Sequence, residues 1–429
     1  MSEPSWRAVY RDRCVDARAA IQVVEPGSLL VFTSYGGEPQ ELIDALVTES
    51  RLAGCRGFQA VRGTREILAD PIGSGGFRLI TYAPAGQAVA QVANGHADYL
   101  PCSVYRACRW LEDGVITPDV ALVNVSTPDE DGYCSFGTSV DFTAIAALRA
   151  RTVVAQVNSS MPKIRGVPRI HVTQLDRIVE VAQPPTPATP PAVDEVAERI
   201  GAFIAELVPD GATLEVGIGG VPDATLRALK THRDLGIHSG LLTDGMMWLY
   251  HAGAITGARK PVDRGLMIAN QVIGTADLFA FAESCPAVEM RSATYTHDPT
   301  VLAKLPRFTA LNSALQVDLR GQVNAESLRG RQVAGTGGSL DFAIGAALSP
   351  GGRSIVALPS TAGGGRYSRI VARLTDDPVA TLPATLVDYV VTEYGVAELR
   401  GHTAQERAQA LLSICHPDHR DRVDKEQSQ

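Results

Sequence analysis

A proline-rich segment divides the chain into two parts. The segment "VAQPPTPATPPAVDEVAER" spans residues 181–199 and holds five prolines within eight residues. Such a run favours extended polyproline II backbone and interrupts both helices and central strands. Asp194 then provides a helix N-cap ahead of apolar residues at helical spacing. We therefore expect an N-terminal domain over residues 1–183, a linker over residues 184–193 and a second domain over residues 194–429.

Length and composition agree with two globular domains. The chain has 429 residues, of which 45% are hydrophobic and 20% charged, so a single core is not expected. The formal net charge is −8, and no basic run is present that would neutralise phosphates, so we expect no nucleic acid partner. The N-terminus is too polar for a secretory signal, and no apolar run reaches the roughly 18 residues of a membrane span. A cytoplasmic protein without a membrane partner is the expectation.

Four continuous apolar runs predict buried strands, with helix-like segments between them. They lie at residues 119–126, 152–157, 354–359 and 388–395. This pattern favours mainly parallel sheets that are covered by helices on both faces. In such sheets, ligands usually bind beyond the carboxyl ends of the strands.

Two segments, one from each half, share a design. "PGSLLVFTSYGGEPQELIDAL" begins at Pro26, and "PDGATLEVGIGGVPDATLRAL" begins at Pro209. Each combines an apolar strand, a glycine turn and an amphipathic helix with proline in its first turn. The expected fold is α/β, with two similar open domains.

Glycine-rich loops in the second half are candidate ligand sites. In "EVGIGGVPDATL", the residues Gly217, Ile218, Gly219 and Gly220 place backbone amides at a helix start, where they can bind a phosphate or an oxyanion. The segment "AGTGGSLDFAIGAAL" repeats the device with Gly335, Gly337 and Gly338, and "STAGGGRYSRIV" carries a third glycine run at residues 363–365. Each loop is open to a second interpretation as a tight turn. The dinucleotide pattern G-x-G-x-x-G is not completed, because Asp223 falls at its third glycine.

Other nucleophile and metal patterns are absent from the sequence. The seven cysteines are scattered without disulfide or zinc spacing, and the histidines make no metal-ligand pattern. Ser239 and Ser360 lack the elbow motif of a hydrolase nucleophile. We therefore expect no metal site and no permanently bound cofactor, and we interpret Cys134 as a buried structural thiol.

Several motifs follow one another along the chain: "PDEDGYCSFGTSVD" (128–141), "GIGGVPDA" (217–224), "LGIHSGLLTDG" (235–245), "LNSALQVDLRGQVNAES" (311–327), "GTGGSLDF" (335–342), "LPSTAGGG" (358–365), "VDYVVTEYGVAELRG" (387–401) and "ICHPDHR" (414–420). Together they resemble those of the acetyl-CoA hydrolase/CoA-transferase family, which includes 4-hydroxybutyrate and butyrate CoA-transferases. The resemblance runs from about residue 10 to residue 422. It implies a CoA-transferase-like fold, acyl-CoA and coenzyme A as substrates, a CoA site on the second domain and a homo-oligomer.

The resemblance also implies a mechanism. In the family, a glutamate carboxylate attacks the thioester to give an acyl-glutamyl anhydride, and CoA returns to give a glutamyl-CoA thioester. Backbone amides of glycine loops hold the oxyanions formed on the way. By resemblance, these amides belong to the turn of Gly217, Ile218 and Gly219 and to the pair Gly337 and Gly338.

The chain departs from the family pattern at the nucleophile. The family has L-G-I-H-T-E where this chain has "LGIHSG", so Ser239 matches the threonine and Gly240 replaces the glutamate. Ser339 stands where glutamine is frequent, and Ala384 stands where arginine is frequent. The segment "ATYTHDP" (293–299) stands where the family tends toward D-Y-T-N-D-P. A glycine cannot form an anhydride, so a remodelled active site is expected.

Three hypotheses follow from this departure. An enzyme that transfers the acyl group directly from CoA to a bound amine, hydroxyl or water is the first, with His238 as a candidate general base. A conventional CoA-transferase with a relocated carboxylate is the second, and Glu215, Asp244 and Glu289 are its candidates. A CoA-binding subunit without turnover is the third. Ligand contacts by Glu393, Tyr394 or His402 are left open.

Overall fold

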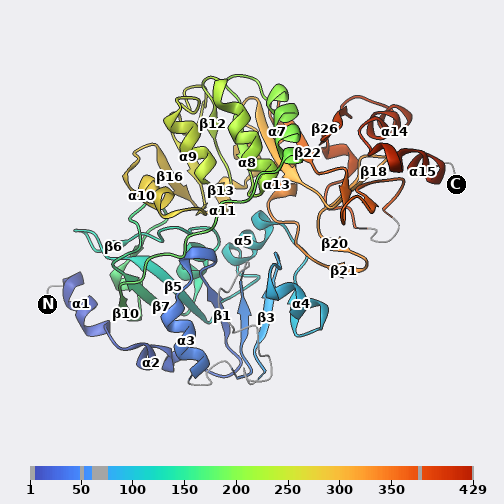
Figure 1. Cartoon of the computed structure of the whole chain (residues 1–429). Helices are drawn as coiled ribbons and strands as arrows, with labels where there is room; N and C mark the ends of the chain where they lie inside the picture. The colour runs from blue at the N-terminus through green and yellow to red at the C-terminus, as the bar shows by residue number, and fades with distance from the viewer. Residues whose placement is uncertain (1–4, 49–52, 60–75, 375–378, 428–429) are drawn as a thin grey trace. The chain divides into compact units, whose positions relative to one another are not determined.

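The computed structural model describes residues 5–48, 53–59, 76–374 and 379–427. The chain forms two compact units, and Figure 1 labels their elements. Unit 1 comprises Met1–Ala188 and Ala269–Tyr295, and unit 2 comprises Thr189–Ile268 and Thr296–Gln429. The first change of unit lies within the proline-rich segment. Two short elements span the other changes of unit: β14 (Met267–Ala269) and α11 (Ala293–Thr296).

The segment Ala269–Tyr295 differs from the domain boundaries expected from the sequence, because it belongs to unit 1. Its strand β16 (Val288–Arg291) pairs in parallel with β8 (Gly166–Val167). Gln271 Nε2 donates a hydrogen bond of 2.8 Å to the buried Asp141 carboxylate. The boundaries expected from the sequence assumed that each domain is one continuous stretch of chain. They could not assign to unit 1 a segment that follows part of unit 2 in the sequence.

Unit 1 contains an all-parallel sheet whose strands have the order β10-β7-β5-β1-β2-β3-β4 (Figure 1). The strands are β1 (Leu29–Phe32), β2 (Arg56–Phe58), β3 (Arg78–Thr81), β4 (Ala97–Tyr99), β5 (Val120–Ser126), β7 (Thr152–Asn158) and β10 (Arg177–Val181). The helices are α1 (Trp6–Arg13), α2 (Ala17–Ala20), α3 (Gln40–Thr48), α4 (Gln87–Ala93), α5 (Val104–Glu112), α6 (Thr143–Arg149) and α10 (Ala276–Ser284). The strands predicted at 119–126 and 152–157 are confirmed as β5 and β7.

The side chains of strand β1 are buried on both faces of the sheet, so all of its residues are apolar. Leu30 and Phe32 belong to one core cluster of unit 1, together with Leu42 of α3. Leu29 and Val31 belong to the other cluster, together with Leu111 of α5. Successive side chains of a strand point to opposite faces, so both faces of this sheet are buried under helices.

Unit 2 contains a six-stranded sheet in the order β12-β11-β17-β22-β26-β27, which is parallel except for the antiparallel edge strand β27. The strands are β11 (Thr213–Val216), β12 (Gly236–Ile237), β17 (Phe308–Ser313), β22 (Arg353–Ala357), β26 (Tyr389–Thr392) and β27 (Gly395–Glu398). The helices are α7 (Glu195–Leu207), α8 (Gly220–Ala228), α9 (Asp244–His251), α12 (Pro299–Leu302), α13 (Ser339–Leu348), α14 (Ala404–Ser413) and α15 (Pro417–Gln427). The strands predicted at 354–359 and 388–395 correspond to β22 and β26.

The design shared by the two segments that begin at Pro26 and Pro209 is visible in the structure. In unit 1, strand β1 leads through a glycine turn into α3, and in unit 2, β11 leads through a glycine turn into α8. Asp194 caps α7 as expected, because its carboxylate accepts a hydrogen bond of 2.8 Å from the amide of Ala197. The prediction of an α/β fold with mainly parallel sheets is confirmed.

Smaller features complete the fold. Unit 2 adds a three-stranded sheet of β18 (Gln316–Asp318), β19 (Val323–Asn324) and β25 (Ile370–Val371), and hairpins β20 (Ser327–Leu328) with β21 (Arg331–Gln332) and β23 (Thr361–Ala362) with β24 (Tyr367–Ser368). All seven cysteines have free thiols, and all except Cys14 are buried. Within the described ranges, every helix is too short or too polar to cross a membrane.

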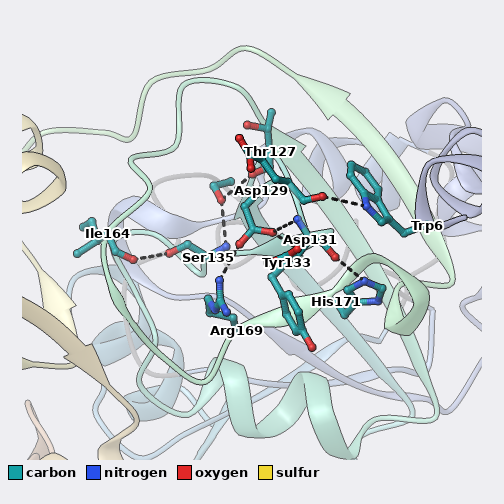
Figure 2. A network of polar contacts seen from close by, with 11 residues as sticks. Trp6, Thr127, Asp129, Asp131, Tyr133, Ser135, Ile164, Arg169 and His171 are labelled. Carbon is teal, nitrogen blue, oxygen red and sulfur yellow. Dashed lines mark hydrogen bonds and ion pairs between the residues drawn. The ribbon is translucent and has the colours of Figure 1, made fainter.

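Figure 2 shows how Asp129 organises a loop of unit 1 between β5 and β6 (Tyr133–Cys134). One carboxylate oxygen accepts the amide protons of Asp131, at 3.0 Å, and Tyr133, at 2.8 Å. The other oxygen pairs with Arg169 at 2.7 Å, and the Arg169 guanidinium lies over the Tyr133 ring. Trp6 of α1 donates a hydrogen bond to the carbonyl of Glu130 in the same loop. Asp129 therefore orders the start of the motif at residues 128–141.

Replacement of Asp129 is expected to destabilise this loop. Asp129→Ala should lower the free energy of unfolding by about 1–3 kcal/mol, because two backbone amides lose their acceptor. Urea denaturation measures the change. Glu130→Ala is the matched control, because its side chain is exposed, and it should change stability by less than about 0.5 kcal/mol. Equal effects of the two substitutions would contradict the role given to Asp129.

Candidate functional site

The first candidate loop follows strand β11 in unit 2. Gly217, Ile218 and Gly219 connect β11 to α8, which begins at Gly220. Gly219 has φ 137° and ψ 172°, a conformation open to glycine and unfavourable for other residues. The first amides of a helix have no intrahelical partner, and Ile218 is half exposed. The loop thus presents backbone donors at the carboxyl end of a sheet strand, where an anion or an oxyanion can bind.

The second candidate loop lies beside the first. Strand β12 runs parallel to β11, and the amide of His238 continues this pairing by donating to the carbonyl of Leu214 at 3.1 Å. Ser239 Oγ donates to the carbonyl of Val216 at 3.4 Å. Because Val216 directly precedes Gly217, this contact holds Ser239 and Gly240 next to the first glycine loop.

Gly240 is buried, and the side chain of His297 lies directly beside its backbone. A Cβ atom built on Gly240 would lie 3.2 Å from Cε1 and 3.3 Å from Nε2 of His297, and 3.8 Å from Cε2 of Phe342. The φ angle of Gly240 is outside the left-handed region that favours glycine. The backbone therefore does not require glycine at this position, and the neighbouring imidazole is what limits a side chain here.

The same imidazole lies against the glycine loop that precedes α13. A Cβ atom on Gly338 would lie 2.6 Å from Nε2 of His297 and 2.8 Å from Phe342, so a side chain is excluded. Gly338 directly precedes α13, and Gly337 has φ 57°. Gly335 lies half buried in the same loop. His297 is thus in close approach to two glycines that come from loops far apart in the sequence.

His297 is held in an apolar environment. Its side chain is buried, its Nδ1 lies 2.8 Å from Thr296 Oγ1, and its ring centroid is 4.4 Å from that of Phe342. Burial lowers the pKa of His297 to about 3. The imidazole is therefore neutral at pH 7, and a pKa this far below 7 makes it a weak proton acceptor.

The structure brings most of the predicted site residues into one region of unit 2. Ser239 is anchored beside the loop of residues 217–220, and Gly240 and Gly338 both approach His297. His238 is fully buried, and its backbone bridges to Ile268. Sequence reasoning did not select His297 as a site residue. The only signal for it was the histidine in "ATYTHDP", where the family tends toward asparagine.

The three carboxylates considered as alternative nucleophiles lie in different environments. Glu215 on β11 is buried, and burial raises its pKa to about 8 while a hydrogen bond from the backbone of Leu311 opposes this shift. A protonated carboxyl group is a poor nucleophile at pH 7. Glu289 lies in unit 1, where it forms an ion pair with Arg291. Asp244 is the first residue of α9.

Three further sets of residues are engaged in local structure. Glu393 accepts hydrogen bonds from the amide of Ser360 at 2.8 Å and from its hydroxyl at 2.6 Å. The ring of Tyr394 lies 5.3 Å from that of His416. The glycines at 363–365 all have positive φ and join the antiparallel strands β23 and β24. This third glycine run therefore forms a hairpin turn.

Comparison with known proteins places the chain in a family. The model of the acetyl-CoA hydrolase/transferase N-terminal domain matches residues 78–190, and the model of its C-terminal domain matches residues 274–427. The chain is 41% identical to the 4-hydroxybutyrate coenzyme A transferase of Clostridium kluyveri over 97% of each chain. Among solved structures, a 4-hydroxybutyrate CoA-transferase from Porphyromonas gingivalis matches with a TM-score of 0.82 and 36% identity, covering 98% of this chain and 99% of that one. RipA from Yersinia pestis matches with a TM-score of 0.92 and 30% identity over 98% of each chain. The chain therefore belongs to the acetyl-CoA hydrolase/transferase family.

Proposed function

We propose that the protein transfers an acyl group from acyl-CoA directly to a bound acceptor, without a glutamyl-CoA intermediate. The acceptor is an amine, a hydroxyl or water. Family membership supports the first part of this proposal, an acyl-CoA-utilising transferase or hydrolase. The absence of a carboxylate at Gly240, in the loop where the family carries its nucleophile, is the observation that supports the second part.

The proposed reaction uses groups at the ends of β11 and β12. The acceptor atom attacks the thioester carbon, the C–S bond breaks, and the acceptor's proton passes to the CoA thiolate. In this proposal, amides of the loop from Gly217 to Gly220 stabilise the oxyanion, an interaction that typically contributes roughly 10²–10³ in rate. No nucleophilic side chain extends from Gly240, so in this proposal the acceptor itself attacks the thioester.

Coenzyme A enters this proposal as a substrate, with its site on unit 2, and no permanently bound cofactor is needed. The acceptor is a small molecule. We also expect a homo-oligomer, as the family resemblance implies. Size-exclusion chromatography with light scattering tests the oligomeric state directly.

A conventional CoA-transferase reaction is the second candidate. The relatives favour it by name, since one is a succinyl-CoA:cyclohexane-1-carboxylate CoA transferase from Geobacter metallireducens, 36% identical over 97% of this chain. This reaction needs a substitute carboxylate positioned within about 1 Å of productive geometry. Glu215 is protonated at pH 7, so Asp244 is the stronger candidate for that role in unit 2.

The test is the fate of acyl-CoA substrates. A panel of acyl-CoAs is incubated with the purified protein, with and without acetate, and the products are separated and identified by mass. Release of free CoA that does not depend on acetate, and that rises with added amines or alcohols, is the expected result. A new acyl-CoA that forms only with acetate would favour the conventional reaction. Binding of CoA without any turnover would favour the third hypothesis, a non-catalytic CoA-binding subunit.

A further inference from the structure

We infer that Arg329 and Arg366 bind the phosphates of coenzyme A, and that the ring of Tyr367 holds their two guanidinium groups in place. All three residues lie in unit 2. This inference deepens the proposed function, because it rests on coenzyme A as the substrate. It does not depend on which acceptor takes the acyl group.

The two arginines meet at the ring of one exposed tyrosine. The Cζ atom of Arg329 lies 5.0 Å from the centroid of the Tyr367 ring, and the Cζ atom of Arg366 lies 6.0 Å from it. The face of an aromatic ring attracts a guanidinium group, so the ring gathers two of them at one place. Their planar forks match a phosphate group in both geometry and charge. Interaction with the guanidinium groups of Arg329 and Arg366 also lowers the pKa of Tyr367, as expected in a positive local field.

Carboxylates do not neutralise this pair of arginines in the described ranges of the chain. Other arginines do have such partners, since Arg169 pairs with Asp129 at 2.7 Å and Arg422 pairs with Glu426 at 2.7 Å. The chain as a whole is acidic, with 47 Asp and Glu against 39 Lys and Arg, so composition does not account for the difference. Like charges held close together repel each other, and an anion that binds to both relieves this repulsion.

Two short hairpins present these side chains. Arg329 and Gly330 form the two-residue turn between β20 and β21, with φ angles of 54° and 72°. Such turns usually combine asparagine, aspartate or glycine with glycine, and a positive φ is uncommon for arginine. Arg366 lies in the turn between β23 and β24, and Tyr367 begins β24. Unfavourable backbone conformations of this kind gather at functional sites.

Both hairpins are connected to the loops of the candidate site. The hairpin of β23 and β24 follows the carboxyl end of β22, and β22, β17 and β11 are parallel neighbours. It therefore leaves the sheet at the same edge as the loop from Gly217 to Gly220. The hairpin of β20 and β21 leads into the loop of Gly337 and Gly338. Glu326, just before β20, accepts a hydrogen bond of 3.0 Å from the hydroxyl of Thr336 in that loop.

The spacing along this edge suits coenzyme A. A ligand that reaches from the loop after β11 to the hairpin after β22 crosses two strand spacings, roughly 10 Å at about 4.8 Å each. Coenzyme A spans such a distance, because its pantetheine arm separates the thiol from the pyrophosphate and the ribose phosphate. With the acyl group at the loop after β11, the phosphates reach the two arginines.

The test measures binding of free coenzyme A to the full-length protein by isothermal titration calorimetry. Arg329→Ala and Arg366→Ala should each raise the Kd roughly 10-fold, because each removes a charge-assisted contact with phosphate. Tyr367→Phe keeps the ring and should change the Kd less than about threefold, whereas Tyr367→Leu should weaken binding more.

Lys230→Ala is the matched control. Lys230 is also an exposed cation over an aromatic ring, since its Nζ lies 5.5 Å from the centroid of the Trp248 ring. It follows the C-terminal end of α8, whereas the loop from Gly217 to Gly220 lies at the N-terminal end of that helix. Its substitution should leave the Kd for coenzyme A unchanged.

Steady-state kinetics separate a phosphate contact from a general loss of activity. In the two arginine variants, the KM for acyl-CoA should rise roughly 10-fold, while kcat stays within about twofold of the wild-type value. Turnover of the matching acyl-pantetheine, which lacks the nucleotide and its phosphates, should be the same in all variants. Added salt should weaken binding of coenzyme A to the wild-type protein more than to the variants.

Three outcomes would overturn the inference. They are an unchanged Kd in both arginine variants, an equal loss of activity with acyl-pantetheine, and weaker binding of ADP with unchanged binding of coenzyme A, which would show a separate nucleotide site. Circular dichroism confirms that each variant is folded. The Kd for free coenzyme A requires no turnover. Acetate-dependent formation of a new acyl-CoA would therefore contradict direct transfer while leaving the phosphate site intact.

Discussion

The double variant Gly240→Glu/His297→Asn is expected to gain carboxylate-dependent CoA exchange, at a rate roughly 10² above that of Gly240→Glu alone. The glutamate supplies the nucleophile that the family uses, and the asparagine removes the imidazole that occupies its path. A displacement of about 1 Å in a reacting group can cost 10² in rate. Exchange is measured as transfer of CoA from an acyl-CoA to labelled acetate.

The geometry around residue 240 explains why one substitution does not suffice. The new Cβ atom would contact the His297 ring at 3.2 Å and 3.3 Å, closer than most contacts of this kind. The ring has little room to retreat, because Phe342 and Thr296 hold it. The rest of the glutamate side chain must extend beyond this contact, so we expect the single variant to hold its carboxylate away from productive geometry.

Gly240→Gln/His297→Asn is the matched control for the double variant. It has the same size and no carboxylate, and should therefore show no exchange and no covalent CoA adduct. A glutamyl-CoA adduct in the glutamate variant, identified by peptide mass, would support the placement of the nucleophile. Exchange by Gly240→Glu alone that equals the double variant would show that His297 is no obstacle. An inactive double variant that is folded would place the lost nucleophile elsewhere.

The fold was largely predictable because its signals are local. The apolar runs that became β5 and β7 needed no tertiary information, since a strand buried on both faces must be apolar throughout. Asp194 likewise predicted the start of α7, because the N-cap contact depends on its own side chain. The segment Ala269–Tyr295 was assigned wrongly from sequence, because its membership in unit 1 depends on pairings such as Met290 with Gly166.

The candidate site was predictable only in part, for the same reason. The loops at Gly217, Gly240 and Gly338 carry glycine patterns that can be read locally, and the resemblance gave each of them an expected role. No sequence pattern around His297 predicts that it lies against the glycine loops. Its position depends on the fold, which brings the residue before α12 against two glycine loops. The glycine run at 363–365, in contrast, looked like the ligand loops but forms a hairpin turn.

Glu215 provides a second large effect, in stability rather than rate. In the folded protein burial raises its pKa to about 8, against an ordinary value of 4.5. Between these values the unfolded chain has lost the proton and the folded protein still holds it. Stability therefore falls as pH rises through this window, and above pH 8 the full cost is present.

Glu215→Gln should remove this pH-dependent cost, because glutamine keeps the shape of the protonated acid and cannot ionise. The gain in the free energy of unfolding should be about 3–4 kcal/mol larger at pH 8 than at pH 5, since each pKa unit corresponds to about 1.4 kcal/mol. Comparing the two pH values cancels any constant cost of the amide. Urea denaturation at both values gives the measurement, and Glu206→Gln on the exposed side of α7 should show no such difference. A gain of equal size at both pH values would mean that the folded protein carries Glu215 as an ionised carboxylate, and this would return it to the list of possible nucleophiles beside Gly240.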